Sequence, residues 1–192
     1  MSKIIRILST TDLHGTIYPY DYANHKEHTY GVAKIKTLID SLRDENTIVI
    51  DNGDTIEGSP FTYYHYANNI DKVCPLSLAM KTIKYDFLNV GNHDFNYGPD
   101  ALFKHIEAVD TPCITSNVLY KDKHLGPEYI VKNLCDKKIV FFAVTTHFVP
   151  KWENPINIKD GEKWSDGQPP LSHLITDPML HSTEYYSSLP RD

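Results

Sequence analysis

Three short polar clusters in the chain combine carboxylate, imidazole and amide side chains with neighbouring glycines. They are Asp12-Leu13-His14-Gly15, Asn52-Gly53-Asp54 and Gly91-Asn92-His93-Asp94. These side chains are hard or borderline ligands, which suit Mn, Zn, Fe or Mg better than a soft metal. One carboxylate that bridges two such ions, flanked by His, Asp and Asn, is the arrangement that generates hydroxide at neutral pH and attacks phosphorus. The residue types therefore indicate a hydrolytic site with two divalent metal ions.

Each cluster comes directly after a segment that we expect to be a β-strand. In an open α/β sheet the carboxyl ends of the strands form the site crevice, so we expect the three clusters to converge there. The alternation of strands and helices with short connections is typical of an α/β layered fold. We expect strands over 3–9, 47–51, 85–90, 113–116, 128–134 and 138–144, and helices over about 31–45, 75–83 and 99–109.

Each cluster taken singly also has a purely structural explanation. A lone Asp after a strand is usually a helix cap or a turn residue, and a lone His near a core is usually only hydrogen-bonded. Three clusters at the same topological position, in the order DxH, GD and GNH, favour one shared site over three separate turns.

The motifs D-L-H-G, G-D-T-I-E-G-S-P and G-N-H-D-F-N-Y-G resemble those of the calcineurin-like metallophosphoesterases. More narrowly, they resemble the bacterial 5′-nucleotidases and 2′,3′-cyclic-nucleotide 2′-phosphodiesterases, over about residues 3–159. The resemblance implies a layered α/β metallophosphoesterase-type fold, with central β-sheets flanked by helices. It also implies two divalent metal ions and a nucleotide or cyclic nucleotide as substrate, hydrolysed by a metal-bridging hydroxide.

The resemblance assigns metal ligands residue by residue. Asp12 and His14 would hold the first ion and Asp54 would bridge both ions. The second ion would be held by Asn92, which would also touch a phosphate oxygen.

Catalysis is assigned to His93 and Asn96. His93 would protonate the leaving oxygen or stabilise the transition state. Asn96 stands where many 5′-nucleotidases have Asp, and an amide can orient His93 by a hydrogen bond but cannot offset its positive charge. The F-N-Y-G form resembles the cyclic-phosphodiesterase side of the branch. Asn117 would lie near the substrate pocket, with a strand-end turn as the alternative, and His147 is expected on the site side of the last strand.

The family pattern breaks after about residue 159. The segments that normally complete both coordination spheres, a His-Gly pair and a Gly-His-x-His type segment, do not occur in the sequence. We therefore expect residues 1–159 to be the N-terminal portion of a metallophosphoesterase domain whose C-terminal part is missing, in a truncated or frame-shifted chain. Residues 160–192 are rich in Pro and Ser, and we expect them to form an irregular tail. His173 and His181 are the residues of this tail that could substitute for the missing metal ligands.

Two alternatives to an active hydrolase remain open. One is a catalytically incomplete member of the family that binds at most one metal ion or a nucleotide weakly. The other is a nucleotide-binding module without catalysis, which is weakened because the sequence has no phosphate-cradling Gly-rich loop.

Composition sets outer limits on the function. The 192 residues carry a net charge of −6, which argues against a nucleic-acid polymer and against an anionic membrane surface as partner. Three widely spaced cysteines and an N-terminus without a signal-peptide layout lead us to expect a cytoplasmic protein. The incomplete domain would expose a sheet edge, so we also expect self-association.

Overall fold

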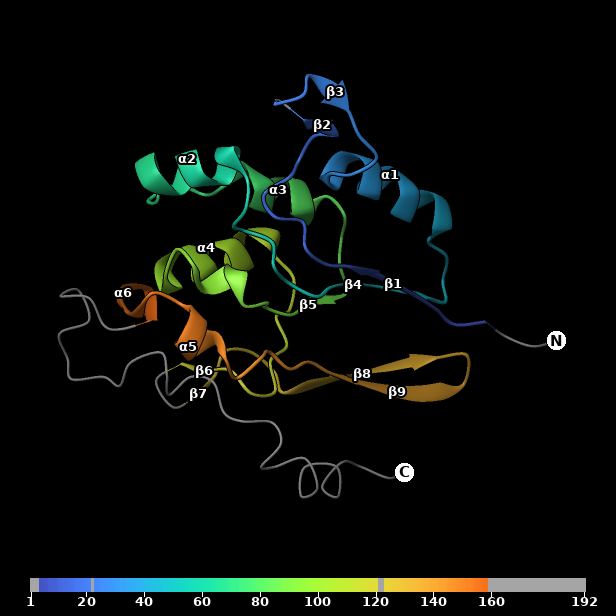
Figure 1. The fold of residues 1–192 in the computed structure, drawn as a ribbon. Helices are drawn as coiled ribbons and strands as arrows, with labels where there is room; N and C mark the ends of the chain where they lie inside the picture. The colour runs from blue at the N-terminus through green and yellow to red at the C-terminus, as the bar shows by residue number, and fades with distance from the viewer. Residues whose placement is uncertain (1–3, 22, 121–122, 159–192) are drawn as a thin grey trace.

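A three-stranded parallel sheet lies at the centre of the computed structural model, which describes residues 4–21, 23–120 and 123–158 (Figure 1). The strand order is β1 (Arg6–Thr10), β4 (Thr47–Asp51), β5 (Phe87–Leu88). β1 and β4 pair along their full length, from Arg6 opposite Thr47 to Thr10 opposite Asp51. Because the three strands run in the same direction, the loops that follow them meet at one edge of the sheet.

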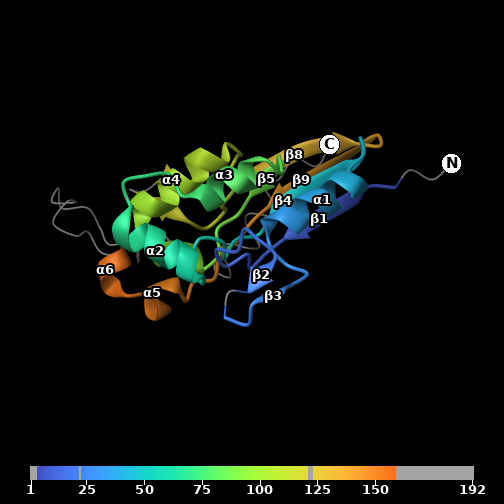
Figure 2. The same ribbon diagram turned by 90° about the horizontal axis from the view of Figure 1, so that it is seen from above.

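Helices cover one face of this sheet. α1 (Val32–Leu42) connects β1 to β4, and α3 (Pro75–Lys81) lies between β4 and β5 in the chain. α4 (Pro99–Val109) packs against α3 (Figures 1 and 2). The main core joins apolar side chains from the sheet and from these helices, among them Val49, Ile39, Leu76, Leu88 and Leu102.

An antiparallel hairpin covers the opposite face of the sheet (Figure 1). It consists of β8 (Tyr129–Leu134) and β9 (Lys137–Phe142). Side chains along β8 alternate between exposed and half-buried, as expected for a strand with one face on a core. Phe141 of the hairpin meets Phe87 of the sheet, with ring centroids 5.0 Å apart, inside a second apolar cluster.

Short elements fill the connections. They are β2 (Tyr20–Asp21), β3 (Lys26–Glu27), α2 (Pro60–Asn68), the 3-10 helix η1 (His93–Phe95), β6 (Leu119–Tyr120), β7 (Lys123–His124), α5 (Val149–Trp152) and α6 (Pro155–Ile158). The sequence reasoning missed α2, although Ser59 caps it by accepting a hydrogen bond from the Thr62 N–H at 3.2 Å and Pro60 stands at its first position.

The α/β class, with a parallel sheet and flanking helices, is confirmed. The expected strand over 113–116 is wrong, because Cys113 forms only an isolated parallel bridge with Leu88. The Ile114 N–H still donates to the Leu88 carbonyl at 2.8 Å, but the N–H groups after it turn away from β5: Thr115 donates to Pro127 and Ser116 donates to Ala143. β5 is only two residues long, so no partner is left for a longer strand.

Three predictions concern features that the structure leaves untested. The boundary at residue 159 and the tail residues His173 and His181 lie outside the described residues. Self-association also stays a prediction, although β1 is an edge strand with Ile7 52% exposed. No helix in the described part of the chain is long and apolar enough to cross a membrane.

Candidate metal centre

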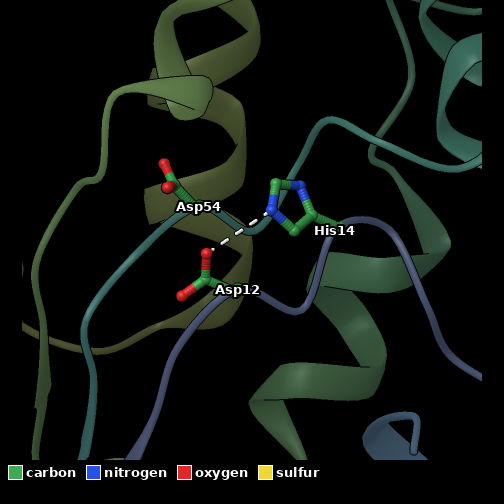
Figure 3. Close-up of side chains that lie close together, drawn as sticks. All are labelled: Asp12, His14 and Asp54. Carbon is green, nitrogen blue, oxygen red and sulfur yellow. Dashed lines mark ion pairs between the residues drawn. The ribbon is translucent and has the colours of Figure 1, made fainter.

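The loops after β1 and β4 bring Asp12, His14 and Asp54 together (Figure 3). Each residue offers one ligand atom, and these atoms all lie within 4.8 Å of one another. It is the one such group of His, Cys, Asp and Glu side chains found in residues 4–21, 23–120 and 123–158. Asp12 is exposed, whereas His14 and Asp54 are half-buried, so the cluster is open to solvent on one side.

All three residues adopt the left-handed backbone conformation, with φ of 54° at Asp12, 42° at His14 and 57° at Asp54. This conformation is uncommon for residues other than glycine. Hydrogen bonds between the two loops hold it in place. The Asp12 N–H donates to the Gly53 carbonyl at 3.0 Å, and the His14 N–H donates to the Asp54 carbonyl at 3.1 Å. The two loops therefore continue the pairing of β1 with β4 beyond the strands.

The ring of His14 is oriented by a backbone carbonyl. Its Nδ1 lies 2.9 Å from the carbonyl oxygen of Glu57, which can only accept, so Nδ1 carries the hydrogen. The lone pair of Nε2 is then free, 3.5 Å from Oδ1 of Asp12. Gly58 leaves room for this ring, because a Cβ at that position would come within 2.7 Å of Nδ1.

These donors fit a divalent metal ion. Two ligand atoms that each lie about 2.1 Å from one ion are about 3–3.5 Å apart at ordinary coordination angles, in line with the 3.5 Å between His14 Nε2 and Asp12 Oδ1. A histidine that donates its other ring nitrogen to a carbonyl is the usual form of a metal-binding imidazole. Carboxylate and imidazole together do not select one ion among Mn, Zn, Fe and Mg.

The loop after β5 reaches the same place. The backbone N–H of His93 donates to Oδ1 of Asp54 at 2.8 Å, which brings the neighbouring Asn92 to the cluster edge. The Asn92 side chain is half-buried and forms no hydrogen bond with another described residue. Its role as ligand to a second ion stays a prediction.

The His93 ring lies beside the ring of His14, with centroids 5.3 Å apart. Its Nδ1 is 2.9 Å from Oδ1 of Asn96 and 3.4 Å from Oε2 of Glu57. The hydrogen bond expected between Asn96 and His93 is therefore present. Within the described part of the chain, no residue forms a hydrogen bond or ion pair with Nε2 of His93, and its catalytic role stays a prediction.

Asp94 is a residue of the site that the sequence reasoning left without a role. Its buried carboxylate accepts four backbone hydrogen bonds: Oδ2 from Asp54 (2.9 Å) and Gly91 (2.8 Å), and Oδ1 from Thr55 (2.8 Å) and Ile56 (3.1 Å). This side chain joins the loops after β4 and β5. Its position directly after G-N-H was the available signal, but three of its four partners lie about 40 residues away in the sequence.

Asp51, at the end of β4, is a second buried carboxyl group close to the site. Burial raises the pKa of Asp51 to about 7, and the nearby charge of Asp94 acts in the same direction. Hydrogen bonds from the hydroxyl groups of Thr10 (2.5 Å) and Thr55 (3.1 Å) oppose this rise in pKa.

Two other residues singled out in the sequence lie outside the cluster. The buried amide of Asn117 donates to the Thr145 carbonyl at 2.7 Å and accepts from the Thr145 N–H at 2.9 Å, which fixes the chain just after β9. His147 is half-buried and lies against the ring of Phe148, with centroids 4.2 Å apart. The substrate-binding role of Asn117 stays a prediction.

The chain is similar in sequence to several phosphoesterases. It is 37% identical over 120 residues to the 2′,3′-cyclic-nucleotide 2′-phosphodiesterase/3′-nucleotidase of Yersinia enterocolitica, covering 60% of this chain and 18% of that protein. The Salmonella typhimurium protein of the same name is 32% identical over 164 residues, covering 82% of this chain and 24% of that protein. A 5′-nucleotidase of Vibrio parahaemolyticus is 31% identical over 159 residues, covering 79% and 26%. The chain thus spans about a quarter or less of the length of these relatives.

A solved structure and a family model agree with this relationship. The calcineurin-like phosphoesterase YfkN from Bacillus subtilis matches with a TM-score of 0.71 and 27% identity, covering 95% of this chain and 58% of that one. The family model described as calcineurin-like phosphoesterase matches residues 5–188. The chain therefore belongs to the calcineurin-like phosphoesterase family, and the relatives that it matches in part are named as 5′-nucleotidases and 2′,3′-cyclic-nucleotide phosphodiesterases.

Proposed function

We propose that the chain forms the first half of the active site of a metal-dependent hydrolase that acts on the phosphoesters of nucleotides. The observation that carries this proposal is the convergence of Asp12, His14 and Asp54 within 4.8 Å, with the His93 ring beside them. The printed names of the Yersinia, Salmonella and Vibrio relatives support a nucleotide or cyclic nucleotide as substrate.

Asp12, His14 and Asp54 would hold one divalent ion, and Asp54 with Asn92 would hold a second. Bound ions of this kind supply a nucleophile from water at neutral pH and neutralise charge on the phosphoryl oxygens. The chain itself fixes the ligand atoms. The Glu57 carbonyl keeps the hydrogen on Nδ1 of His14, which leaves the Nε2 lone pair for the ion.

His93 would act on the substrate through Nε2. Its Nδ1 is already engaged by Asn96 and faces Glu57, so Nε2 is the ring nitrogen left for a phosphoryl or leaving-group oxygen. When both ring nitrogens carry a hydrogen, the proton on Nε2 can pass to the leaving oxygen as the ester bond breaks, and the neutral ring then keeps its hydrogen on Nδ1.

We further propose a 2′,3′-cyclic nucleotide as the preferred substrate. Asn96 supports this choice, because the F-N-Y-G form resembles the cyclic-phosphodiesterase side of the branch. The relatives with 37% and 32% identity carry that activity in their names.

Hydrolysis assays on the manganese-loaded chain test the proposal. The substrates are 2′,3′-cyclic AMP, 3′-AMP and 5′-AMP, and product is separated by chromatography. We expect metal-dependent turnover, fastest on the cyclic nucleotide, that is lost in Asp54→Asn and kept in Asp71→Asn, the same change at an exposed position outside the cluster. A chain that binds manganese through Asp54 but hydrolyses none of the three substrates would instead support the catalytically incomplete alternative.

A further inference from the structure

Three side chains from distant parts of the sequence form a hydrogen-bonded line that begins at His93. Nδ1 of His93 donates to Oδ1 of Asn96 at 2.9 Å, and Nδ2 of Asn96 donates to Oε2 of Glu153. Glu153 lies directly after α5, 57 residues beyond Asn96 in the sequence, and is 8% exposed.

The surroundings of Glu153 are those of a group that only accepts hydrogen bonds. Oε1 accepts from the backbone N–H of Asn154 at 2.7 Å and from Nδ2 of Asn157 at 2.8 Å, while Oε2 accepts from Asn96. Three donors therefore converge on one carboxylate. The Asn157 amide also donates to the backbone carbonyl of Asn96 at 2.6 Å, which ties this segment to η1.

Glu153 decides which way the Asn96 amide faces. An asparagine amide presents an acceptor on one side and a donor on the other, and the two orientations have nearly the same shape. Because the amide nitrogen of Asn96 must face the Glu153 carboxylate, its oxygen must face His93. That oxygen requires a hydrogen on Nδ1 of His93. Glu57 Oε2, at 3.4 Å, is a second acceptor on the same ring nitrogen and acts in the same sense.

We propose that Glu153 is a positioning residue that fixes the Asn96 amide and, through it, the Nδ1–H tautomer of His93. The inference rests on the proposed function, in which Nε2 of His93 faces the substrate. It explains how an asparagine can serve next to this histidine: the carboxylate that the asparagine lacks is supplied from the segment between α5 and α6.

We call the hydrogen-bonded line from His93 through Asn96 to Glu153 the relay. Glu153→Gln reverses the direction of its hydrogen bonds without changing the size of the side chain at position 153. Two donors, from Asn154 and Asn157, meet at the position of Oε1, so the glutamine oxygen is expected to stay there. The glutamine NH2 then faces the NH2 of Asn96, and the Asn96 amide must turn over. The Asn96 nitrogen now donates to Nδ1 of His93, and the ring hydrogen moves to Nε2.

Nitrogen NMR on histidine-labelled, metal-free chain reads this change directly, since a protonated and an unprotonated ring nitrogen have different shifts. Spectra are recorded at a pH about two units above the ordinary histidine pKa, where the rings are neutral. His93→Gln assigns the resonances. We expect the Nδ1–H tautomer in the parent chain, the Nε2–H tautomer in Glu153→Gln, and no change in Glu107→Gln, a matched control at an exposed position on α4. The same measurement in a Glu57→Gln background removes the second acceptor.

A swap of the two groups supplies the rescue. Asn96→Asp alone sets two carboxylates face to face, and we expect this variant to lose the parent tautomer of His93. Adding Glu153→Gln gives the glutamine NH2 a carboxylate partner and leaves a carboxylate oxygen for Nδ1–H, so the double variant should regain the parent tautomer. In turnover, Glu153→Gln should lower kcat by roughly 10²-fold, because the Asn96 NH2 then faces Nδ1 and opposes the hydrogen that Nδ1 must keep when Nε2 gives up its proton. KM should change little, because the substrate's binding contacts are untouched.

The outcomes separate this inference from the proposed function. A chain without hydrolase activity whose tautomer switches as described would refute the proposed function and support the relay. If the hydrogen stays on Nδ1 in Glu153→Gln, both with Glu57 in place and in the Glu57→Gln background, the relay is overturned even in an active enzyme. If circular dichroism shows that Glu153→Gln does not fold, the comparison of Asn96→Asp with the double variant decides, and absence of rescue overturns the proposal.

Discussion

The carboxylate of Asp94 accepts a hydrogen bond from the backbone N–H of Asp54 at 2.9 Å. Asp54 follows β4 and Asp94 follows β5, so this bond holds together two loops that are 40 residues apart in the sequence. The same carboxylate also accepts from the N–H groups of Thr55, Ile56 and Gly91. One buried side chain therefore sets the position of the proposed bridging ligand relative to the loop that carries Asn92 and His93.

Asp94→Asn tests this arrangement. The amide has one acceptor oxygen and an NH2 that cannot accept, so the variant leaves about half of these backbone donors without a partner. We expect a loss of about 2–4 kcal/mol in the free energy of unfolding, since bonds to a charged acceptor contribute about 1.5–3 kcal/mol each. Urea denaturation measures the loss, and calorimetric titration with Mn²⁺ should show weaker binding. Asp71→Asn is the control, and equal stability of the two variants would contradict this role.

Asp54→Ala removes the ligand that both metal positions share in the proposed site. Asp12 and His14 remain, but two donors hold a divalent ion poorly, so we expect affinity for Mn²⁺ to fall by roughly 100-fold or more. Elemental analysis after desalting gives the retained metal. Full metal content in the variant would contradict the assignment of Asp54 as the bridging ligand.

His93→Gln separates metal binding from catalysis. His93 is absent from the ligand cluster, so the variant should bind Mn²⁺ as the parent chain does. Turnover should fall by roughly 10²–10⁴-fold, the usual contribution of a positioned acid or base. His25→Gln, at an exposed loop position, serves as the control. Parent-like turnover in His93→Gln would show that another group assists the leaving oxygen.

The buried His105 makes stability depend on pH. Burial lowers the pKa of His105, against the opposing charge of Asp94, and Oγ of Ser77 lies 2.9 Å from its Nδ1. Below the ordinary histidine pKa the unfolded chain binds a proton that the folded chain refuses. The contribution of His105 to the free energy of unfolding is therefore fully present above the ordinary histidine pKa. It is lost as the pH falls, by at most about 1.4 kcal/mol per pH unit.

Asp51 acts in the opposite sense, because its folded pKa of about 7 means that the folded chain keeps a proton that the unfolded chain releases. The contribution of His105 is therefore measured as a difference. Urea denaturation of the parent and of His105→Gln is compared from about pH 8 to about pH 5. We expect the parent to lose stability relative to the variant as the pH falls, while Ser77→Ala keeps the parent's slope. Parallel curves for parent and His105→Gln would refute the assignment.

The sequence predicted the parts of this site that depend on local pattern. Asp12, His14 and Asp54 follow strands whose apolar residues are contiguous, so their convergence at one sheet edge could be inferred. α2 was missed because its buried positions are Thr62, His65 and Tyr66, which give no apolar period.

The supporting contacts could not be inferred in the same way. Asp94 and Glu153 act on groups about 40 and 57 residues away, and nothing in their local sequence reports those partners. The segment 113–116 has the composition of a strand, but the short β5 beside it ends the pairing after Cys113. Contacts of this kind depend on tertiary geometry, which a local pattern does not encode.

The left-handed backbone at Asp12, His14 and Asp54 limits which residues can replace them. Among residues with a Cβ, Asp, Asn and His enter this conformation most readily, whereas others are held there at a cost of roughly 1–3 kcal/mol each. These three types are also good ligands for divalent ions. Glutamate offers the same carboxylate as aspartate, yet it would be the poorer substitute here for reasons of backbone geometry alone. Transferring these three ligand residues to another sheet would therefore require both hydrogen-bonded loops together. Among family members, we expect substitutions at these positions to exchange Asp, Asn and His with one another more often than to introduce a longer side chain.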